Sequence, residues 1–225
     1  YIHQCSGFLT REKEFLEAVR PAAARKPVGA ERFPLWYALE GEAQATDLAR
    51  QILEEKPYPI RALFALGLNL RMLPDTEQVV KALEKLDFFV DTDLFLTDAA
   101  KYADIVLPAC SSFERGEFKT YPGGYAVYTN PVIEPLGEAK SDAQILCELA
   151  GVMGLEDDLL KSGYEDSIRY MIQDLSVTVE ELKANPLPTL VPERTPYKAG
   201  GYVRQGLCTK SGKFELDSCL IKEHP

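Results

Sequence analysis

The sequence predicts an α/β protein built on an open, mainly parallel β-sheet with helices on both faces. Three apolar segments of strand length, 60–66, 88–91 and 105–107, carry this prediction, because helical patterns separate them along the chain. Strands that alternate with helices form βαβ units, which place successive strands parallel in one sheet. We expect an irregular N-terminal lead-in before this sheet and a helical extension after it.

The first strand is a nearly continuous apolar run over 60–66 that ends in Gly67-Leu68-Asn69. Continuous rather than alternating apolarity is typical of a strand covered on both faces. A helix should follow, with Asp75 as N-cap and Gln78 three residues later. Its apolar residues recur at helical spacing, at Val79, Ala82, Leu83 and Leu86.

A second crossover follows the second strand. We expect Thr97 to cap a short helix over 98–102, and we expect 105–107 to be the third buried strand. Pro108 should end that strand, because proline cannot donate to a central ladder. Ligands bind at the carboxyl edge of open parallel sheets. The candidates there are Asn69, Asp93 and the loop from Cys110 to Arg115.

Several flanking segments also have an expected structure. The pattern predicts a helix over 10–20, an irregular loop over 22–41 that includes Trp36, and an amphipathic helix over 43–55. Trp36 could stack on a cofactor, but packing in the core or at an interface is the favoured interpretation.

The region after the third strand is predicted to support the sheet. We expect an extended edge segment over 125–129, helices over 164–174 and 178–184, and an extended linker over 186–196. Ser141 and Gln144 should form a capping box. The helix that they begin is expected to turn its apolar side chains inward, at Ile145, Leu149, Val152 and Met153.

Composition excludes several classes of function. The chain has 25 basic and 35 acidic side chains in 225 residues, a formal charge of -10, which disfavours binding to nucleic acid. No apolar run approaches the roughly 20 residues of a membrane-spanning helix, and no secretory start is visible. Acidic runs at 156–158 and 180–181 are interpreted as solvated surface, with docking of an electron-transfer subunit as the alternative.

Metal ligands are sparse in this chain. The five cysteines form no C-x-x-C pair, and the two histidines, His3 and His224, lie near opposite ends. Zinc and iron–sulfur sites need closely arranged ligands, so the residues predict no complete metal site and favour reduced, mostly buried thiols. The cysteines are Cys5, Cys110, Cys147, Cys208 and Cys219.

The chemistry at the strand ends is recognition rather than bond-making. A carboxylate after the second strand, at Asp91 or Asp93, can accept paired hydrogen bonds from a ribose diol or from the N–H edge of guanine. An aspartate after a strand is also an ordinary turn former, and both interpretations stay open. Gly67-Leu68-Asn69 is not a G-x-G-x-x-G fingerprint, which disfavours a standard NAD site.

Five motifs occur in an order and spacing that resemble those of the molybdopterin oxidoreductase family, which includes dimethyl sulfoxide reductase, formate dehydrogenase, periplasmic nitrate reductase and thiosulfate or polysulfide reductase. The resemblance covers roughly residues 57–154, and the stretch from Thr209 to Leu216 is similar to the family's passage toward its C-terminal barrel. The motifs are Gly67-Leu68-Asn69, the run over 86–97, the run over 102–109, Glu114-Arg115-Gly116 and the run over 137–142.

The resemblance implies a Rossmann-like domain that holds part of a bis(molybdopterin guanine dinucleotide) cofactor containing molybdenum or tungsten. Thr92 and Asp93 correspond to the pair that contacts the nucleotide, and Arg115 to a basic residue suited to phosphate oxygens. The implied cofactor-binding residues are Gly67, Asn69, Thr92, Asp93, Arg115 and Asp142. Asp142 has an equally open alternative in the first turn of the helix that Ser141 caps.

The chain also departs from the family pattern. Residues 120–125 replace an asparagine and an arginine near the substrate channel of many members, so the substrate stays unassigned. We find neither the 4Fe-4S cysteine cluster nor a molybdenum ligand, and we expect both in a missing N-terminal part of a parent enzyme. The implied partners are the remaining domains of that catalytic subunit and an iron–sulfur electron-transfer subunit.

Two function hypotheses therefore remain. The first is a cofactor-binding piece of a molybdenum or tungsten oxidoreductase, soluble, of prokaryotic type and inactive alone, in a cytoplasmic or an exported, membrane-associated enzyme. The second is a cofactor-free scaffold of the same fold in a larger redox complex, as in respiratory complex I. The expected division is a lead-in over 1–56, the cofactor-binding domain over 57–155, and a helical extension and linker over 156–225.

Overall fold

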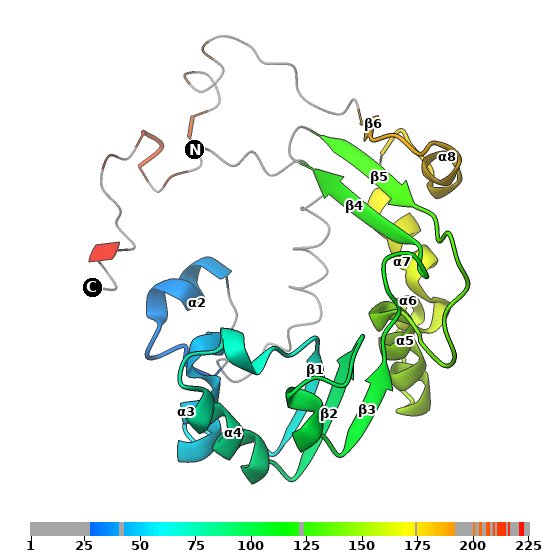
Figure 1. Ribbon diagram of the computed structural model, residues 1–225. Coiled ribbons are helices and arrows are strands. Elements are labelled where there is room, and N and C mark those ends of the chain that lie inside the picture. The colour runs from blue at the N-terminus through cyan, green and yellow to red at the C-terminus, as the bar shows by residue number, and fades with distance from the viewer. Residues whose placement is uncertain are drawn as a thin grey trace. The chain divides into compact units, whose positions relative to one another are not determined.

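A computed structural model describes residues 28–40, 43–121, 124–173 and 175–191, with short stretches and single residues between 200 and 222 (Figure 1). The chain forms two compact units, each assembled from segments that are separate in sequence. The described residues of the first unit lie in 62–70 and 87–191, and those of the second in 28–61, in 71–86 and from 200 onward. The helix expected over 10–20 lies outside the described residues.

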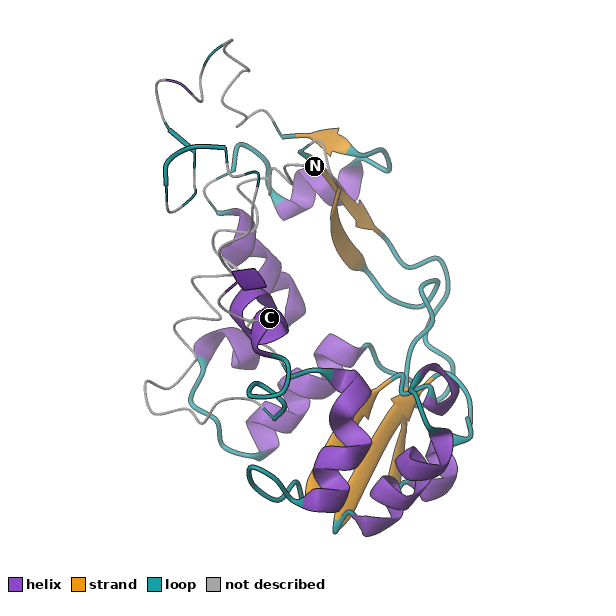
Figure 2. Cartoon of the chain, turned by 90° about the vertical axis from the view of Figure 1, so that its left-hand side faces the viewer, coloured by secondary structure: helices purple, strands orange, loops and turns teal. Residues whose placement is uncertain are grey.

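A parallel sheet in the first unit confirms the predicted fold class (Figure 2). Its strands are β1 (Ala62–Leu66), β2 (Phe88–Asp93) and β3 (Ile105–Pro108), in the order β1-β2-β3. The chain passes through helix α4 (Thr76–Lys85) between β1 and β2. It passes through the 3-10 helix η3 (Ala99–Tyr102) between β2 and β3. The protein is therefore an α/β protein with an open parallel sheet.

Burial in this sheet is concentrated in the central strand. Residues 89–92 of β2 are each at most 6% exposed, whereas Ala65 is the buried residue of β1 and β3 has none. The prediction of three buried strands is therefore wrong for β1 and β3. Both are the outer strands of the three-stranded sheet that the described residues form, so an apolar run in the sequence does not ensure complete coverage.

The η3 helix differs from its prediction at its start. It begins after Asp98, which makes no side-chain cap, and Thr97 does not cap it either. The Thr97 hydroxyl is buried and has no hydrogen-bond partner among the described residues. The segment forms a 3-10 helix, as is common for connectors this short.

An antiparallel sheet follows, with strands β4 (Glu117–Tyr121), β5 (Tyr125–Thr129) and β6 (Thr189–Leu190) in the order β4-β5-β6. It corrects two predictions. The segment 125–129 is the central strand rather than an edge, because β4 and β6 pair with it on opposite sides, and its residues 126–128 are buried. Residues 189–190, expected in a linker, pair with β5, and 192–196 lie outside the described residues.

Four helices complete the described part of the first unit: α5 (Asp142–Val152), α6 (Asp158–Ser162), α7 (Tyr164–Ile172) and α8 (Val179–Ala184). Helices α7 and α8 confirm the two predicted over 164–174 and 178–184. Their apolar faces form one core cluster with β5. The central members of this cluster are Ala126, Tyr128, Ile168, Ile172, Val179 and Leu182.

Helix α5 begins after Ser141 as predicted, but the predicted capping box is only half formed and the buried face differs. The Ser141 hydroxyl accepts a hydrogen bond from the Gln144 N–H at 3.2 Å, whereas the Gln144 side chain donates to Glu148. Ile145 and Ala150 are buried, as predicted for Ile145. The inward orientation is wrong for the other three residues, since Leu149, Val152 and Met153 are 37%, 87% and 65% exposed. Among the described elements, α5 packs against α6 and α7, which leave these three side chains exposed.

The second unit contains α2 (Pro34–Glu40), η1 (Ala45–Asp47), α3 (Leu48–Glu54) and α4, and η2 (Leu70–Met72) lies at the boundary of the units. Together, η1 and α3 confirm the helix predicted over 43–55. Asp75 caps α4 as predicted, accepting from the Gln78 N–H at 3.3 Å. Helix α2 corrects the irregular loop predicted over 22–41, because Pro34 has a backbone angle suited to a first helical residue.

A buried carboxylate organises this second unit. Asp47 is 5% exposed and accepts hydrogen bonds from Arg50, Gln51 and Arg32. The Arg50 hydrogen bond is the main reason that the pKa of Asp47 lies below its ordinary value. Trp36 in α2 is 40% exposed, so it is not a core residue of this unit. No helix among the described residues is long and apolar enough to cross a membrane.

Truncation of Ile168 should test the core of the first unit. Ile168 is fully buried in the cluster, so Ile168→Ala should lower the free energy of unfolding by about 2–5 kcal/mol. Val152→Ala is the control, because this side chain is 87% exposed and its loss should change stability by less than about 0.5 kcal/mol. Urea unfolding followed by circular dichroism measures both values, and equal losses would contradict this core assignment.

Candidate functional site

The carboxyl edge of the parallel sheet brings together residues that are far apart in sequence. The Gly67 N–H donates to the Thr92 carbonyl at 2.8 Å, and the Ala109 N–H donates to the Asp93 carbonyl at 3.1 Å. These backbone bonds extend both strand pairs by one residue. They hold the segments that follow β1, β2 and β3 against one another, as expected for neighbouring parallel strands.

A fourth segment joins this edge next to β3. Ala109 and Lys140 form an isolated parallel bridge, in which the Lys140 N–H donates to the Pro108 carbonyl at 3.1 Å and the Cys110 N–H donates to the Lys140 carbonyl at 2.9 Å. Helix α5 starts two residues later, at Asp142. Its N-terminus, with a partial positive charge, therefore lies at the same edge as the strand ends.

Asp93 is half-buried at the end of β2. One of its carboxylate oxygens, Oδ1, accepts the Leu94 N–H at 2.7 Å. This is the turn-forming role that the sequence left open beside ligand binding. No described residue donates a hydrogen bond to its second oxygen, Oδ2. Asp93 can therefore both shape the turn and accept a hydrogen bond from a ligand.

Two buried polar side chains precede Asp93 in β2. Asp91 is 0% exposed and Thr92 is 1% exposed. Among the described residues, neither Asp91 carboxyl oxygen nor the Thr92 hydroxyl has a hydrogen-bond partner. Burial, and then the charge of Asp93, raise the pKa of Asp91. Hydropathy alone could not identify this unusual environment, because it depends on the coverage of β2.

Gly67 and Asn69 lie in the segment that follows β1. Gly67 has a φ of +68°, in the left-handed region that glycine adopts most easily, and a side chain there would meet no atom within 4 Å. Asn69 is exposed two residues later. Both residues are at the predicted edge, and their role in binding stays a prediction.

Arg115 and Asp142 lie close together, as the sequence suggested. The Arg115 guanidinium donates to the Cys110 carbonyl at 3.2 Å and lies 3.6 Å from carboxylate oxygens of both Asp142 and Glu117. Its side chain is 27% exposed. These ion pairs are long, so Arg115 keeps hydrogen-bonding capacity for an anionic ligand.

Glu114 holds the loop that carries Arg115. Its carboxylate accepts the Ser111 N–H and the Leu136 N–H, each at 2.7 Å. Hydrogen bonds from Ser111, through its side chain and its backbone, and from Leu136 lower the pKa of Glu114. Sequence reasoning noted Glu114 as part of a motif but assigned it no role, because Leu136 is distant in the chain.

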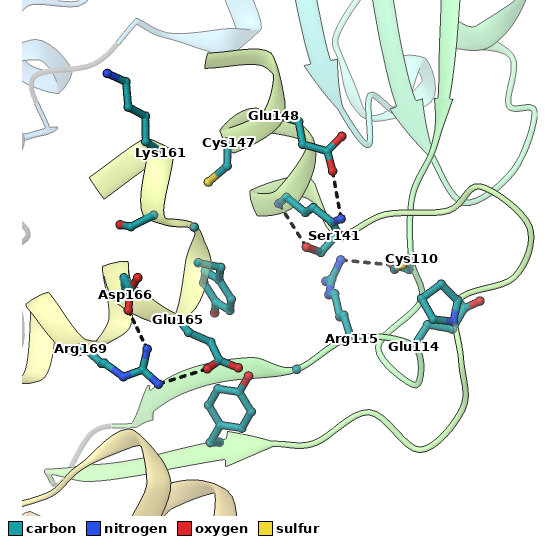
Figure 3. Close-up of a pocket in the computed structure, with 17 residues that line it drawn as sticks. Cys110, Glu114, Arg115, Ser141, Cys147, Glu148, Lys161, Glu165, Asp166 and Arg169 are labelled. Carbon is teal, nitrogen blue, oxygen red and sulfur yellow. Dashed lines mark hydrogen bonds and ion pairs between the residues drawn. The ribbon is translucent and has the colours of Figure 1, made fainter. Parts of the chain in front are cut away.

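A pocket of about 740 Å³ opens beside Arg115 in the first unit (Figure 3). Residues of the loop after β3, of β5 and of helices α5, α6 and α7 line this pocket. Gly116 lies on its wall, and an added Cβ at this position would stand 2.2 Å from the Tyr128 hydroxyl. Tyr128 is 4% exposed, so glycine permits a close approach that any side chain would block.

Two free cysteines, Cys110 and Cys147, also line the pocket. Cys110 is buried and Cys147 is half-buried, and burial raises the pKa of both thiols. Protonated thiols are poor metal ligands and poor nucleophiles. No group of three potential ligands is found among the described residues, and the other three cysteines lie outside them.

Comparison with known proteins shows which family this chain belongs to. The family model named molybdopterin oxidoreductase matches residues 28–152. The chain is 38% identical to the probable oxidoreductase YoaE of Bacillus subtilis, covering 99% of this chain and 32% of YoaE. It is 33% identical to the acetylene hydratase of Syntrophotalea acetylenica, covering 80% of this chain and 25% of that enzyme.

A solved structure is similar as well. The structure of acetylene hydratase from Pelobacter acetylenicus matches 87% of this chain and 30% of that chain, with a TM-score of 0.72 and 29% identity. The chain thus belongs to the molybdopterin oxidoreductase family. It spans about a third or less of the length of these relatives.

A substitution at Asp91 should change how stability depends on pH. The folded-state pKa is raised above the ordinary value of 3.8, so the folded protein binds more protons than the unfolded chain above that pH. Stability should fall as pH rises from about 4 to the folded pKa. Asp91→Asn should remove this fall and make the protein more stable than wild type at pH 7, measured by urea unfolding across pH. The exposed Glu156→Gln is the control, and destabilisation of Asp91→Asn at every pH would contradict the assignment.

Gly116→Ala should disturb the wall of the pocket. The new methyl group would collide with Tyr128, so we expect a loss of about 1–3 kcal/mol in the free energy of unfolding. Gly151→Ala is a matched control in α5, where a Cβ meets no atom within 4 Å and alanine favours the helix. Thermal unfolding should move in opposite directions for these two variants, and a stabilised Gly116→Ala would refute the close approach.

Proposed function

We propose that this chain is part of a molybdenum or tungsten enzyme and binds the guanosine and phosphate portion of a bis(molybdopterin guanine dinucleotide) cofactor. One observation carries the proposal. Asp93, the Arg115–Asp142 pair and the N-terminus of α5 lie along one carboxyl edge of a parallel sheet, in a member of the molybdopterin oxidoreductase family. This edge is the usual ligand-binding edge of open α/β sheets.

The chemistry of the residues fits such a ligand. The second carboxylate oxygen of Asp93 can accept from the N–H edge of guanine, and Arg115 can donate to phosphate oxygens. The first turn of α5 adds backbone N–H groups that have no partner within the helix, of which Ser141 caps that of Gln144. Gly67, Asn69 and Thr92 complete the proposed set, because Gly67 and Asn69 follow the neighbouring strand β1 and Thr92 directly precedes Asp93 in β2.

Unused hydrogen-bonding capacity at this edge supports the fit. The Asp91 carboxyl and the Thr92 hydroxyl are buried without partners among the described residues. Buried polar atoms are normally satisfied by protein groups, ordered water or a ligand. A nucleotide or the waters around it would satisfy these atoms without a change of fold.

The proposed role is binding rather than turnover. When bound, the cofactor would supply the metal and dithiolene sulfurs at which chemistry occurs. The metal ligand, a 4Fe-4S centre and an electron-transfer subunit would belong to other parts of the enzyme, with residues 57–155 as the cofactor-binding domain. One relative is named as a hydratase, so oxidoreductase activity is part of this proposal rather than a consequence of family membership.

Guanosine diphosphate is the probe for the proposed site. Calorimetric titration of the full-length polypeptide, produced without cofactor, should detect binding of this nucleotide. Asp93→Ala should weaken it roughly 10- to 100-fold, because a hydrogen bond to a charged group contributes about 1.5–3 kcal/mol.

Two controls make the titration specific. Adenosine diphosphate should bind more weakly, because adenine lacks the adjacent N1–H and N2–H donors with which guanine can make paired hydrogen bonds to a carboxylate. The exposed Glu156→Ala variant should bind like wild type. Absence of guanosine diphosphate binding, or binding unchanged in Asp93→Ala, would favour the cofactor-free scaffold instead.

A further inference from the structure

Two loops run past each other beside the candidate site. The first, residues 109–116, leaves β3 and carries Arg115, and the second, residues 130–141, leads from β5 to α5. Backbone hydrogen bonds join them at both ends. Val132 and Ile133 donate to the Phe113 carbonyl, and Lys140 bridges Ala109.

The side chain of Glu114 also joins the two loops. The Glu114 carboxylate accepts the Ser111 N–H of its own loop with Oε2 and the Leu136 N–H of the other loop with Oε1, each at 2.7 Å. Short hydrogen bonds from N–H groups to an ionised carboxylate are stronger than neutral ones. Glu114 thus both closes the turn over 111–114 and holds the second loop.

Arg115 and Asp142 belong to opposite sides of this junction. Arg115 directly follows Glu114 on the first loop, and Asp142 begins α5 at the end of the second loop. The two charged groups are 3.6 Å apart. In Figure 3, Arg115 lies next to Ser141, the N-cap of α5. Glu114 lies on the loop that carries Arg115, farther from Ser141. The distance between the two loops therefore determines the position of the Arg115 guanidinium relative to the N-terminus of α5.

We propose that Glu114 is a positioning residue that holds Arg115 against the N-terminus of α5 and so sets the affinity of this edge for a guanine nucleotide. The inference rests on the function proposed above. Glu114 does not need to touch the nucleotide. Its carboxylate orders two loops before binding, and a preordered site loses less conformational entropy when the ligand binds.

The test uses the cofactor-free full-length polypeptide with Glu114→Ala, Glu114→Gln, Arg115→Ala and the double variant Glu114→Ala/Arg115→Ala. Glu148→Ala is the matched control, because Glu148 also accepts two hydrogen bonds, from Lys140 and Gln144 side chains, without joining the loops. Guanosine diphosphate affinity is measured by calorimetry. Hydrogen exchange of the Ser111 and Leu136 amides reports on the loops themselves.

Glu114→Ala should weaken guanosine diphosphate binding about tenfold and accelerate hydrogen exchange of both amides. Glu114→Gln should have an affinity between those of wild type and Glu114→Ala, because glutamine keeps one acceptor oxygen. The double variant should bind no more weakly than Arg115→Ala, since Glu114 acts through Arg115. Additive losses, or unchanged affinity in Glu114→Ala, would overturn the proposal. If wild type binds no guanosine diphosphate, the proposed function fails, and unchanged amide exchange in Glu114→Ala would separately refute the holding role.

Discussion

The backbone ladder of β2 is the constraint on which the site depends. β2 pairs with β1 on one side and β3 on the other, and the isolated bridge at Lys140 continues the same parallel arrangement beyond β3. Parallel pairing places every carboxyl end at one edge. The residues after β1, β2 and β3 and the start of α5 therefore meet there, although they span 67–142 in sequence. A shift of this register would move Asp93 away from the loop that carries Arg115, even if no functional side chain were substituted.

The polar groups at this edge fall into two kinds. Glu114 is ionised and satisfied by two N–H donors, whereas Asp91 is buried, has a raised pKa and lacks a partner among the described residues. The first arrangement gives order to loops that contain little regular structure. The second is a local cost to stability, and such costs are found where a protein retains a group for binding. In the proposed site, the two carboxyl groups would act by opposite means, Glu114 by ordering loops and Asp91 through unused hydrogen-bonding capacity.

Family membership and site geometry support different conclusions. Membership in the molybdopterin oxidoreductase family follows from the match over residues 28–152 and agrees with a structural neighbour at a TM-score of 0.72. Nucleotide binding is a proposal, and it rests on the chemistry of Asp93, Arg115 and the α5 N-terminus. The chain covers about a third or less of the length of these relatives, so the metal and the substrate remain part of the proposal.

The sequence alone determined the features that depend on local pattern. Apolar runs and capping residues predicted the parallel sheet, α4, α7 and α8, and motif order predicted a shared binding site for Asp93, Arg115 and Asp142, which stays a prediction. Only the tertiary structure decided which strands are central, which face of α5 is buried and which polar groups have partners. Val152 is exposed and β5 is a central strand because coverage depends on neighbours far away in the chain. For the same reason, the link from Glu114 to Leu136 and the orphaned Asp91 carboxyl could be recognised only after folding brought those segments together.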